Sequence, residues 1–208
     1  MEKLPGAWKA SQYRPLTVFS LVYRTWSSIR ARETLAYLGQ FVPEQVTGNI
    51  PGKSCTDLWL SIQLLLEDST AAQVPVTGVV ADLVKAYNLL PRLPLLAIGV
   101  HLGLPKPIVR AWANALKQMA RSFSIRGTIG PPLQSSTGFA EGCGLSCSAM
   151  LLCNIALSRW IQIRYPPVRL WSYVDNLELT AGNMADARIG LGYMTQFCEL
   201  MDLSLIHI

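Results

Sequence analysis

The chain has 208 residues, half of them hydrophobic and 15% charged, so it is long and apolar enough to bury a core and is not intrinsically disordered. Its 18 basic and 13 acidic residues give a formal net charge of +5, and its five cysteines lack a C-x-x-C pair, so we expect a reduced, intracellular protein without a disulfide framework or zinc site. No uninterrupted apolar run approaches the roughly 20 residues that span a bilayer, and the N-terminus has no signal-peptide or transit-peptide pattern.

The predicted helices and strands alternate along the chain, which is typical of an α/β or α+β fold. In the first half of the chain we expect a helix within residues 14–38, a loop over 39–52, a helix starting at Ser54 or Thr56 and a buried strand over 75–82. Two helices within 94–120, split by 103–107, and a strand or hairpin arm over 123–129 should follow. The remaining predicted elements are an apolar helix over 145–161 and two short strands within 168–180.

Basic residues are concentrated in two blocks. One lies within residues 1–32, and the other, residues 83–140, contains no acidic residue at all. After Glu141 the acidic residues outnumber the basic ones. This distribution suits a polyanion-binding surface beside a metal-binding one, and it is equally compatible with an ordinary solvated surface.

Two carboxylates follow apolar segments. Asp82 ends the predicted strand over residues 75–82, and Asp175 lies at the tip of the hairpin within 168–180. Carboxylates beside buried strands are costly unless they are paired with a metal or with hydrogen-bond donors. Two such groups from distant segments could hold the two ions of a phosphoryl-transfer site, whereas the alternative is that they are a turn residue and a helix cap.

Glycines precede the apolar helix that is predicted over residues 145–161. Gly142 and Gly144 would let the backbone approach a ligand closely, and the helix start behind them presents free N–H groups. A nucleotide base or phosphate could lie there, and the alternative is a plain loop-to-helix junction.

Five segments in order resemble the conserved motifs of a reverse transcriptase, nearest to the non-LTR retrotransposon kind, over about residues 13–180. They are Tyr13-Arg-Pro-Leu-Thr17 with Tyr23-Arg-Thr-Trp26, Glu44 to Gly48 with Pro51-Gly-Lys-Ser54, Ala81-Asp-Leu-Val-Lys-Ala-Tyr87, Gly138 to Ser146, and Tyr173-Val-Asp-Asn176. The chain departs from the family pattern at four positions, where the family usually has Asp, Pro, Gln and Asp; the residues here are Asn88, Ala140, Glu141 and Asn176.

The resemblance implies an α/β (α+β) fold with a reverse-transcriptase-like palm, a small antiparallel sheet backed by helices, and helical fingers. Residues 1–75 would form the fingers and 76–202 the palm, with 100–130 partly returning to the fingers. The last six residues, 203–208, match a reading frame of a sequencing-library adapter, so we expect a non-native tail. A tail of this kind implies that the natural chain continues beyond residue 202. No thumb, endonuclease or RNase H segment is recognised in residues 1–208.

The resemblance also implies an RNA-directed DNA polymerase of a retroelement, with an RNA template, a DNA primer, dNTPs, two Mg²⁺ (or Mn²⁺) ions and no membrane partner. The implied catalytic and metal-binding residues are Asp82, Asp175 and Asn176. The implied nucleotide-binding residues are Arg14, Leu83, Tyr87, Glu141 and Gly142, with Tyr87 as the gate against a 2′-hydroxyl. The residues expected to contact nucleic-acid phosphates are Arg24, Arg30, Lys106, Arg110 and Arg121.

Two alternatives stay open from the sequence. Asn176 brings no negative charge to a metal site, so the domain could be catalytically inactive and only bind RNA or an RNA–DNA duplex. An RNA-templated RNA polymerase is the other alternative. Tyr87 argues against it, because such an enzyme has to admit the 2′-hydroxyl.

Overall fold

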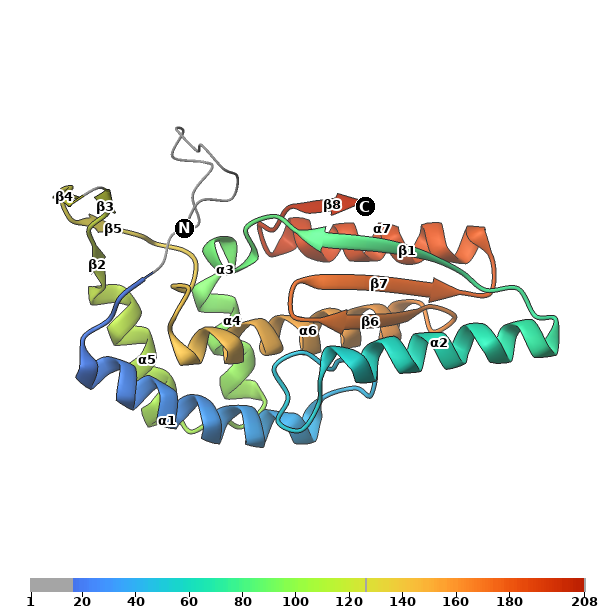
Figure 1. The fold of residues 1–208 in the computed structure, drawn as a ribbon, viewed down its shortest axis with the longest axis horizontal. Helices are drawn as coiled ribbons and strands as arrows, with labels where there is room; N and C mark the ends of the chain where they lie inside the picture. Colours follow the sequence, from blue (N-terminus) through green and yellow to red (C-terminus); the bar gives the residue numbers. More distant parts are fainter. Residues whose placement is uncertain (1–16, 126, 208) are drawn as a thin grey trace.

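The computed structural model describes residues 17–125 and 127–207. A four-stranded sheet in the order β6-β7-β1-β8, with every neighbouring pair antiparallel, forms one half of the molecule (Figure 1). Its strands are β1 (Thr77–Leu83), β6 (Arg169–Tyr173), β7 (Asn176–Ala181) and β8 (Leu205–His207). β8 therefore lies within the segment that we predicted to be a non-native tail, and that assignment stays a prediction.

Helices form the other half of the molecule and cover the sheet. They are α1 (Leu21–Leu38), the 3-10 turn η2 (Gly39–Phe41), α2 (Cys55–Ala72), α3 (Ala86–Leu89), α4 (Arg92–His101), α5 (Lys106–Gln118), α6 (Gly144–Arg164) and α7 (Met184–Leu200). Two small ribbons pair β2 (Ala120–Arg121) with β5 (Leu133–Gln134), and β3 (Ser124–Ile125) with β4 (Thr128–Ile129). α1 and α4 pack against α6, and α5 packs against α4 (Figure 1).

Alternation of side chains gives the sheet two different faces. Ala81, Leu83, Leu177 and Leu179 are each at most 3% exposed and belong to the main core with α6 and α7. On the opposite face, Leu58 and Ile62 of α2 pack on Trp171 of β6. The part of this second face formed by β1 and β7 carries Asp82, Asn176 and Glu178, which the core does not cover.

The long helix α6 is the centre of the core. Among the described residues it is the one helix whose length and composition would let it cross a bilayer, and 72% of that stretch is buried within the fold, as in a core helix. Arg159 and several polar residues interrupt its apolar sequence, so α6 contains no uninterrupted apolar run of bilayer-spanning length.

The structure confirms the predicted fold class, which is mixed helix and sheet with a small antiparallel sheet backed by helices. The helices and strands predicted from residue 21 to residue 180 are present within a few residues of the expected bounds. α3, α7 and β8 were not predicted, nor was the pairing of β2 with β5.

Candidate functional site

The register of β1 against β7 brings the two predicted carboxylates together. Asp82 lies directly opposite Asn176, and the backbone N–H of Leu83 donates to the carbonyl oxygen of Asp175 at 3.3 Å. Directly opposed residues of an antiparallel pair project to the same face. Asp82 and Asn176 therefore share the uncovered face of the sheet, and Asp175 adjoins them in the turn that joins β6 to β7.

A segment of the loop between α1 and α2 supports this turn from outside the sheet. The N–H of Ser172 donates to the carbonyl of Gln45, and the N–H of Thr47 donates to the carbonyl of Ser172, each at 3.0 Å. These bonds press Gly48 against the turn so closely that a Cβ atom there would lie 2.2 Å from the backbone nitrogen of Val174. Only glycine fits at position 48.

Tyr87 lies beside the carboxylates, on the short helix α3. Burial of its hydroxyl is the main cause that raises the pKa of Tyr87 above its ordinary value, and the neighbouring Cys147 and Asp175 raise it further, while Asn49 acts in the opposite direction. These causes indicate that Tyr87 lies near Cys147, in the first turn of α6, and near Asp175.

The glycine-containing loop before α6 packs on the same short helix. The N–H of Phe139 donates to the carbonyl of Tyr87 at 2.6 Å, and the N–H of Gly138 donates to the carbonyl of Leu90 at 3.0 Å. Gly142 has φ +98°, a conformation that side chains with a Cβ rarely adopt. The loop is thus fixed to the segment that carries Tyr87.

A hydrogen bond between two polar side chains links this loop to α3. The side-chain Nδ2 of Asn88 donates to Oε1 of Glu141 at 3.2 Å, and both residues are partly buried. The carboxylate of Glu141, which the sequence places next to the candidate nucleotide pocket, therefore has an amide partner within the protein.

Sequence reasoning missed Arg92, which also binds the loop before α6, at Gly138 and at Ser135. Arg92 is 8% exposed, and its Nε donates to the carbonyl of Gly138 at 2.8 Å. Its Nη1 donates to the carbonyl of Leu116 at 3.1 Å and to that of Ser135. Burial, and then the charge of Arg121, lower the pKa of Arg92. The one sequence feature that could have pointed to Arg92 is its place at the start of an apolar helix, in a stretch without acidic residues.

One of the predicted nucleotide-binding residues lies outside the described part of the chain, and another has its side chain in the core. Arg14 lies outside the described residues. The side chain of Leu83 is 3% exposed and lies in the core with Ala81, and its N–H is bonded to Asp175. A contact between Leu83 and a nucleotide would therefore have to come from its carbonyl group.

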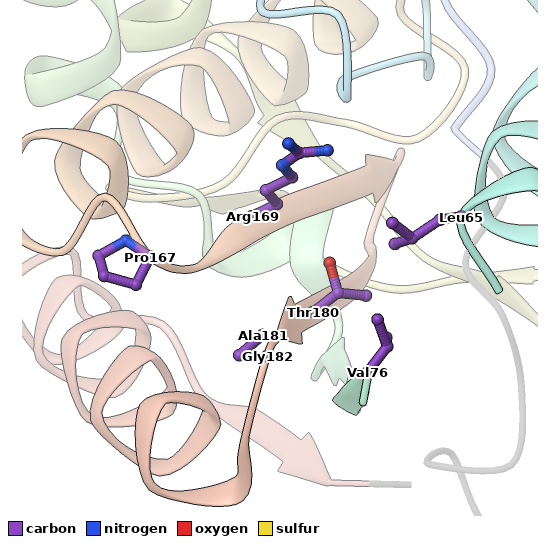
Figure 2. Close-up of a pocket in the computed structure, with 7 residues that line it drawn as sticks. All are labelled: Leu65, Val76, Pro167, Arg169, Thr180, Ala181 and Gly182. Carbon is purple, nitrogen blue, oxygen red and sulfur yellow. The ribbon is translucent and has the colours of Figure 1, made fainter. Parts of the chain in front are cut away.

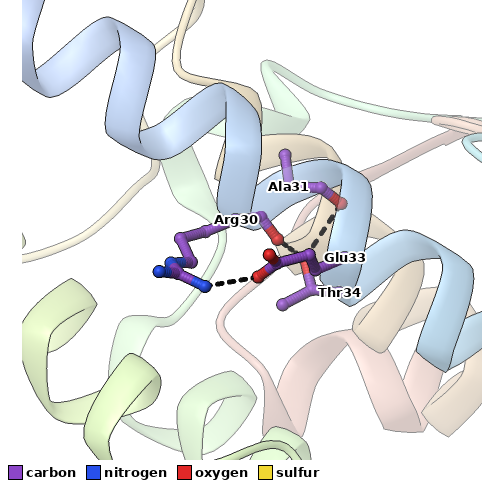
Figure 3. Close-up of polar contacts among 4 residues, drawn as sticks. All are labelled: Arg30, Ala31, Glu33 and Thr34. Carbon is purple, nitrogen blue, oxygen red and sulfur yellow. Dashed lines mark hydrogen bonds and ion pairs between the residues drawn. The ribbon is translucent and has the colours of Figure 1, made fainter.

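The predicted phosphate-binding residues do not share one environment. Lys106 and Arg110 line a common surface pocket on α5, together with Asn114. Arg24 is exposed on α1, whereas Arg121 is partly buried on β2. Arg30 forms an ion pair with Glu33 at 2.6 Å, one turn along α1, where Thr34 also donates to the carbonyls of Arg30 and Ala31 (Figure 3).

A second pocket lies at the far end of the β6–β7 hairpin from the Asp175 turn. Its lining residues are Leu65, Val76, Pro167, Arg169, Thr180, Ala181 and Gly182 (Figure 2). Because the carboxylates lie at the opposite end of the same two strands, this pocket is separate from the candidate site.

The donor set at the carboxylates fits a hard divalent cation. Asp82 and Asp175 supply carboxylate oxygens, and Asn176 supplies an amide oxygen next to them. No group of three or more His, Cys, Asp or Glu side chains that could hold a metal occurs in the part of the chain that the structure describes. Mg²⁺ is commonly bound by one or two carboxylates together with water and substrate phosphates, which suits this smaller set.

No protein-family model and no curated protein matches the sequence. Solved structures do match. Telomerase from Candida albicans, in complex with a fragment of telomeric RNA, gives a TM-score of 0.66 at 11% identity, covering 90% of this chain and 36% of that one. Telomerase from Candida tropicalis with the same kind of RNA fragment gives 0.65 at 12% identity, covering 89% and 34%.

A third match is apo telomerase from Candida tropicalis truncated from its C-terminal domain, with a TM-score of 0.61 at 11% identity, covering 90% of this chain and 41% of that one. The chain therefore spans well under half the length of these structures. Telomerase is a reverse transcriptase, and at such low identity the likeness shows the fold alone. This chain therefore has a fold similar to that of the matching part of these telomerase structures.

Proposed function

We propose that this chain is the fingers and palm of an RNA-directed DNA polymerase from a retroelement, working inside the cell on an RNA template, a DNA primer and dNTPs. The observation that carries the proposal is the β1–β7 register, which brings Asp82, Asp175 and Asn176 to one end of the uncovered sheet face. The reverse-transcriptase-like fold supports the same reading at the level of nucleotidyl transfer.

Each part of the site has a role in this reaction. Asp82 and Asp175, with the amide oxygen of Asn176, would hold the divalent ions, which supply charge neutralisation and an activated primer hydroxyl when bound. Tyr87 would place its ring against the sugar of the incoming nucleotide and leave no room for a 2′-hydroxyl. Glu141 and Gly142 would border the nucleotide.

Lys106 and Arg110 provide the best-supported nucleic-acid contact on the described surface. They lie one helical turn apart on the exposed side of α5, they line one pocket, and residues 83–140 contain no acid to neutralise them. We propose that this side of α5 contacts the phosphate backbone of the template–primer duplex.

Asn176 supports a second candidate function, a domain that binds RNA or an RNA–DNA duplex without extending a primer. An amide in place of a carboxylate keeps one ligand oxygen but removes a negative charge from a site that has to neutralise two divalent ions. The fold and the basic side of α5 would serve both functions equally.

Single-nucleotide primer extension on an RNA template, with Mg²⁺ and Mn²⁺ in parallel, tests the proposal. We expect extension that is lost in Asp82→Asn and Asp175→Asn, while duplex binding is retained in both variants. If the wild-type protein binds duplex but extends no better than Asp82→Asn with either metal, the polymerase proposal fails and the binding function replaces it.

A further inference from the structure

Asn154 is a polar residue at the centre of the long, mostly buried helix α6. It is fully buried in α6, and its neighbours Cys153 and Ile155 are each 1% exposed. Its side-chain Nδ2 donates to the carbonyl oxygen of Val174 at 2.8 Å, whereas its Oδ1 is buried without a hydrogen-bond partner. An apolar residue would avoid that unpartnered oxygen, so the retained amide points to a requirement for the donor.

The residue that accepts this bond is strained. Val174 has φ +59°, and a β-branched side chain in the left-handed region is a conformational outlier that persists only where the surroundings impose it. Two contacts impose it here. Gly48 packs on the backbone nitrogen of Val174 from outside the sheet, and Asn154 holds its carbonyl from the core side.

The strained residue directly precedes Asp175. The backbone conformation of Val174 fixes where the next residue begins, and the carbonyl of Asp175 is itself tied to β1 by the N–H of Leu83. We infer that Asn154 is a positioning residue for Asp175: it holds the turn in the one conformation that brings this carboxylate beside Asp82. The inference concerns the geometry of the turn, and its consequence for metal binding rests on the proposed function.

Amide hydrogen exchange tests the geometry without any need for activity. The N–H of Leu83, bonded to Asp175, reports on the turn, and amides at the other end of the same strand pair, near Thr77 and Ala181, report on the sheet as a whole. In Asn154→Leu we expect exchange at Leu83 to accelerate by about tenfold or more relative to those reference amides, because local opening then costs less.

Ser148→Ala is the matched control. Ser148 is also fully buried on α6 and shares one side-chain bond of 2.8 Å, but with Thr34 of α1 rather than with the turn. We expect its Leu83 ratio to equal that of the wild type. If Asn154→Leu does not fold, Asn154→Ser is used, because its hydroxyl is too short to reach Val174. Equal acceleration at Leu83 and at the reference amides, or none, would overturn the inference.

Relief of strain gives a second, independent readout. Glycine adopts φ +59° without a penalty, so Val174→Gly in the Asn154→Leu background should return the Leu83 ratio to within about threefold of the wild type. No rescue would show that Asn154 acts on something other than the strained turn, which contradicts the inference.

Binding of Mn²⁺ alone, followed by electron paramagnetic resonance, links the turn to the metal. We expect the dissociation constant to rise by about tenfold in Asn154→Leu and to stay unchanged in Ser148→Ala. If the wild type binds Mn²⁺ no better than Asp175→Asn, the proposed function fails, while the exchange ratios still decide whether Asn154 positions the turn. Loss of exchange protection at Leu83 with unchanged Mn²⁺ affinity would overturn the link to the metal.

Discussion

Asn88 and Glu141 are joined by a hydrogen bond of 3.2 Å between residues 53 positions apart in the chain. The reverse-transcriptase motifs that the sequence resembles usually have Asp and Gln at these two positions, so in this chain the carboxylate and the amide stand at each other's positions. The exchange keeps one donor, one acceptor and one negative charge in the wall of the candidate nucleotide pocket. The two departures from the family pattern are thus complementary.

This complementarity predicts a non-additive mutant cycle. Asn88→Asp alone would face Glu141 with a second carboxylate, and we expect a loss of about 1–2 kcal/mol in the free energy of unfolding at pH 7. Asn88→Asp with Glu141→Gln restores the pairing and should return stability to within about 0.5 kcal/mol of the wild type. Chemical denaturation of the wild type, Asn88→Asp, Glu141→Gln and the double variant gives the coupling, and strictly additive losses would show that the pair is not a unit.

If the proposed function holds, Asn176→Asp should speed primer extension. The change restores a negative charge beside Asp175, and we expect single-nucleotide extension with Mg²⁺ to rise by about 10–100-fold, or roughly 1.4–2.7 kcal/mol of transition-state stabilisation. The advantage should shrink with Mn²⁺, which is bound more tightly by such ligands than Mg²⁺. Asp82→Asn sets the background rate. An Asn176→Asp variant that stays at that background contradicts the expectation.

The proposed role of Tyr87 predicts that it sets the preference for deoxyribonucleotides over ribonucleotides. Removing the ring in Tyr87→Ala should let ribonucleotides enter while deoxynucleotides are still used, and we expect the rNTP/dNTP ratio of kcat/KM to rise by about 100-fold, or roughly 3 kcal/mol. Tyr87→Phe keeps the ring and serves as the control, with a ratio near that of the wild type. An equal ratio in all three proteins would limit Tyr87 to a packing role.

The proposed contact between α5 and the duplex predicts how strongly the duplex affinity should depend on salt concentration. If Lys106 and Arg110 each neutralise one duplex phosphate, each alanine variant should lower the slope of log affinity against log salt by about 0.9. Arg30→Ala is the matched control, because Arg30 is already paired with Glu33, and its slope should change less. Fluorescence anisotropy of a labelled RNA–DNA duplex over a salt series measures all three. Slopes that do not change in the α5 variants would place the duplex elsewhere.

The partial burial of Glu178 predicts that the thermal stability of the folded protein depends on pH even without a ligand. Burial raises the pKa of this carboxyl on the uncovered sheet face above its ordinary value, so the folded protein binds its proton more tightly than the unfolded chain. Its contribution to stability is therefore full below the unfolded pKa and is lost as the pH rises through the folded pKa. Glu178→Gln should unfold at a higher temperature than the wild type at pH 7 and at a similar temperature at pH 4. A gain that is equal at both pH values would be inconsistent with the burial of a charged group.

The strands that carry the carboxylates could be predicted because their pattern is local. The β-branched run that ends at Asp82, and the two apolar arms around Asp175, each read as a strand without any knowledge of the rest of the fold. The helix α7 escaped prediction because Gly190 and Gly192 weaken its pattern. The structure explains Gly190, where a Cβ atom would lie 2.8 Å from Val168.

The supports of the site could not be predicted, because their partners are backbone carbonyls far away in the sequence. Arg92 binds the carbonyls of Leu116 and Gly138, and Asn154 binds the carbonyl of Val174. A carbonyl group belongs to every residue type, so no residue pattern marks it as an acceptor. Only the tertiary fold, which brings these segments together, reveals what the buried polar side chains do.

The central helix α6 has a consequence for how the site can move. Its first turn continues from the loop that carries Glu141 and Gly142, and Asn154, about 15 Å further along at 1.5 Å per residue, supports the turn that carries Asp175. One continuous helix thus sets the distance between the loop that carries Glu141 and Gly142 and the turn that carries Asp175. A single-residue insertion between them would rotate Asn154 by about 100° away from Val174. The spacing of the two halves of the site is therefore fixed covalently, and both halves should shift together whenever α6 moves.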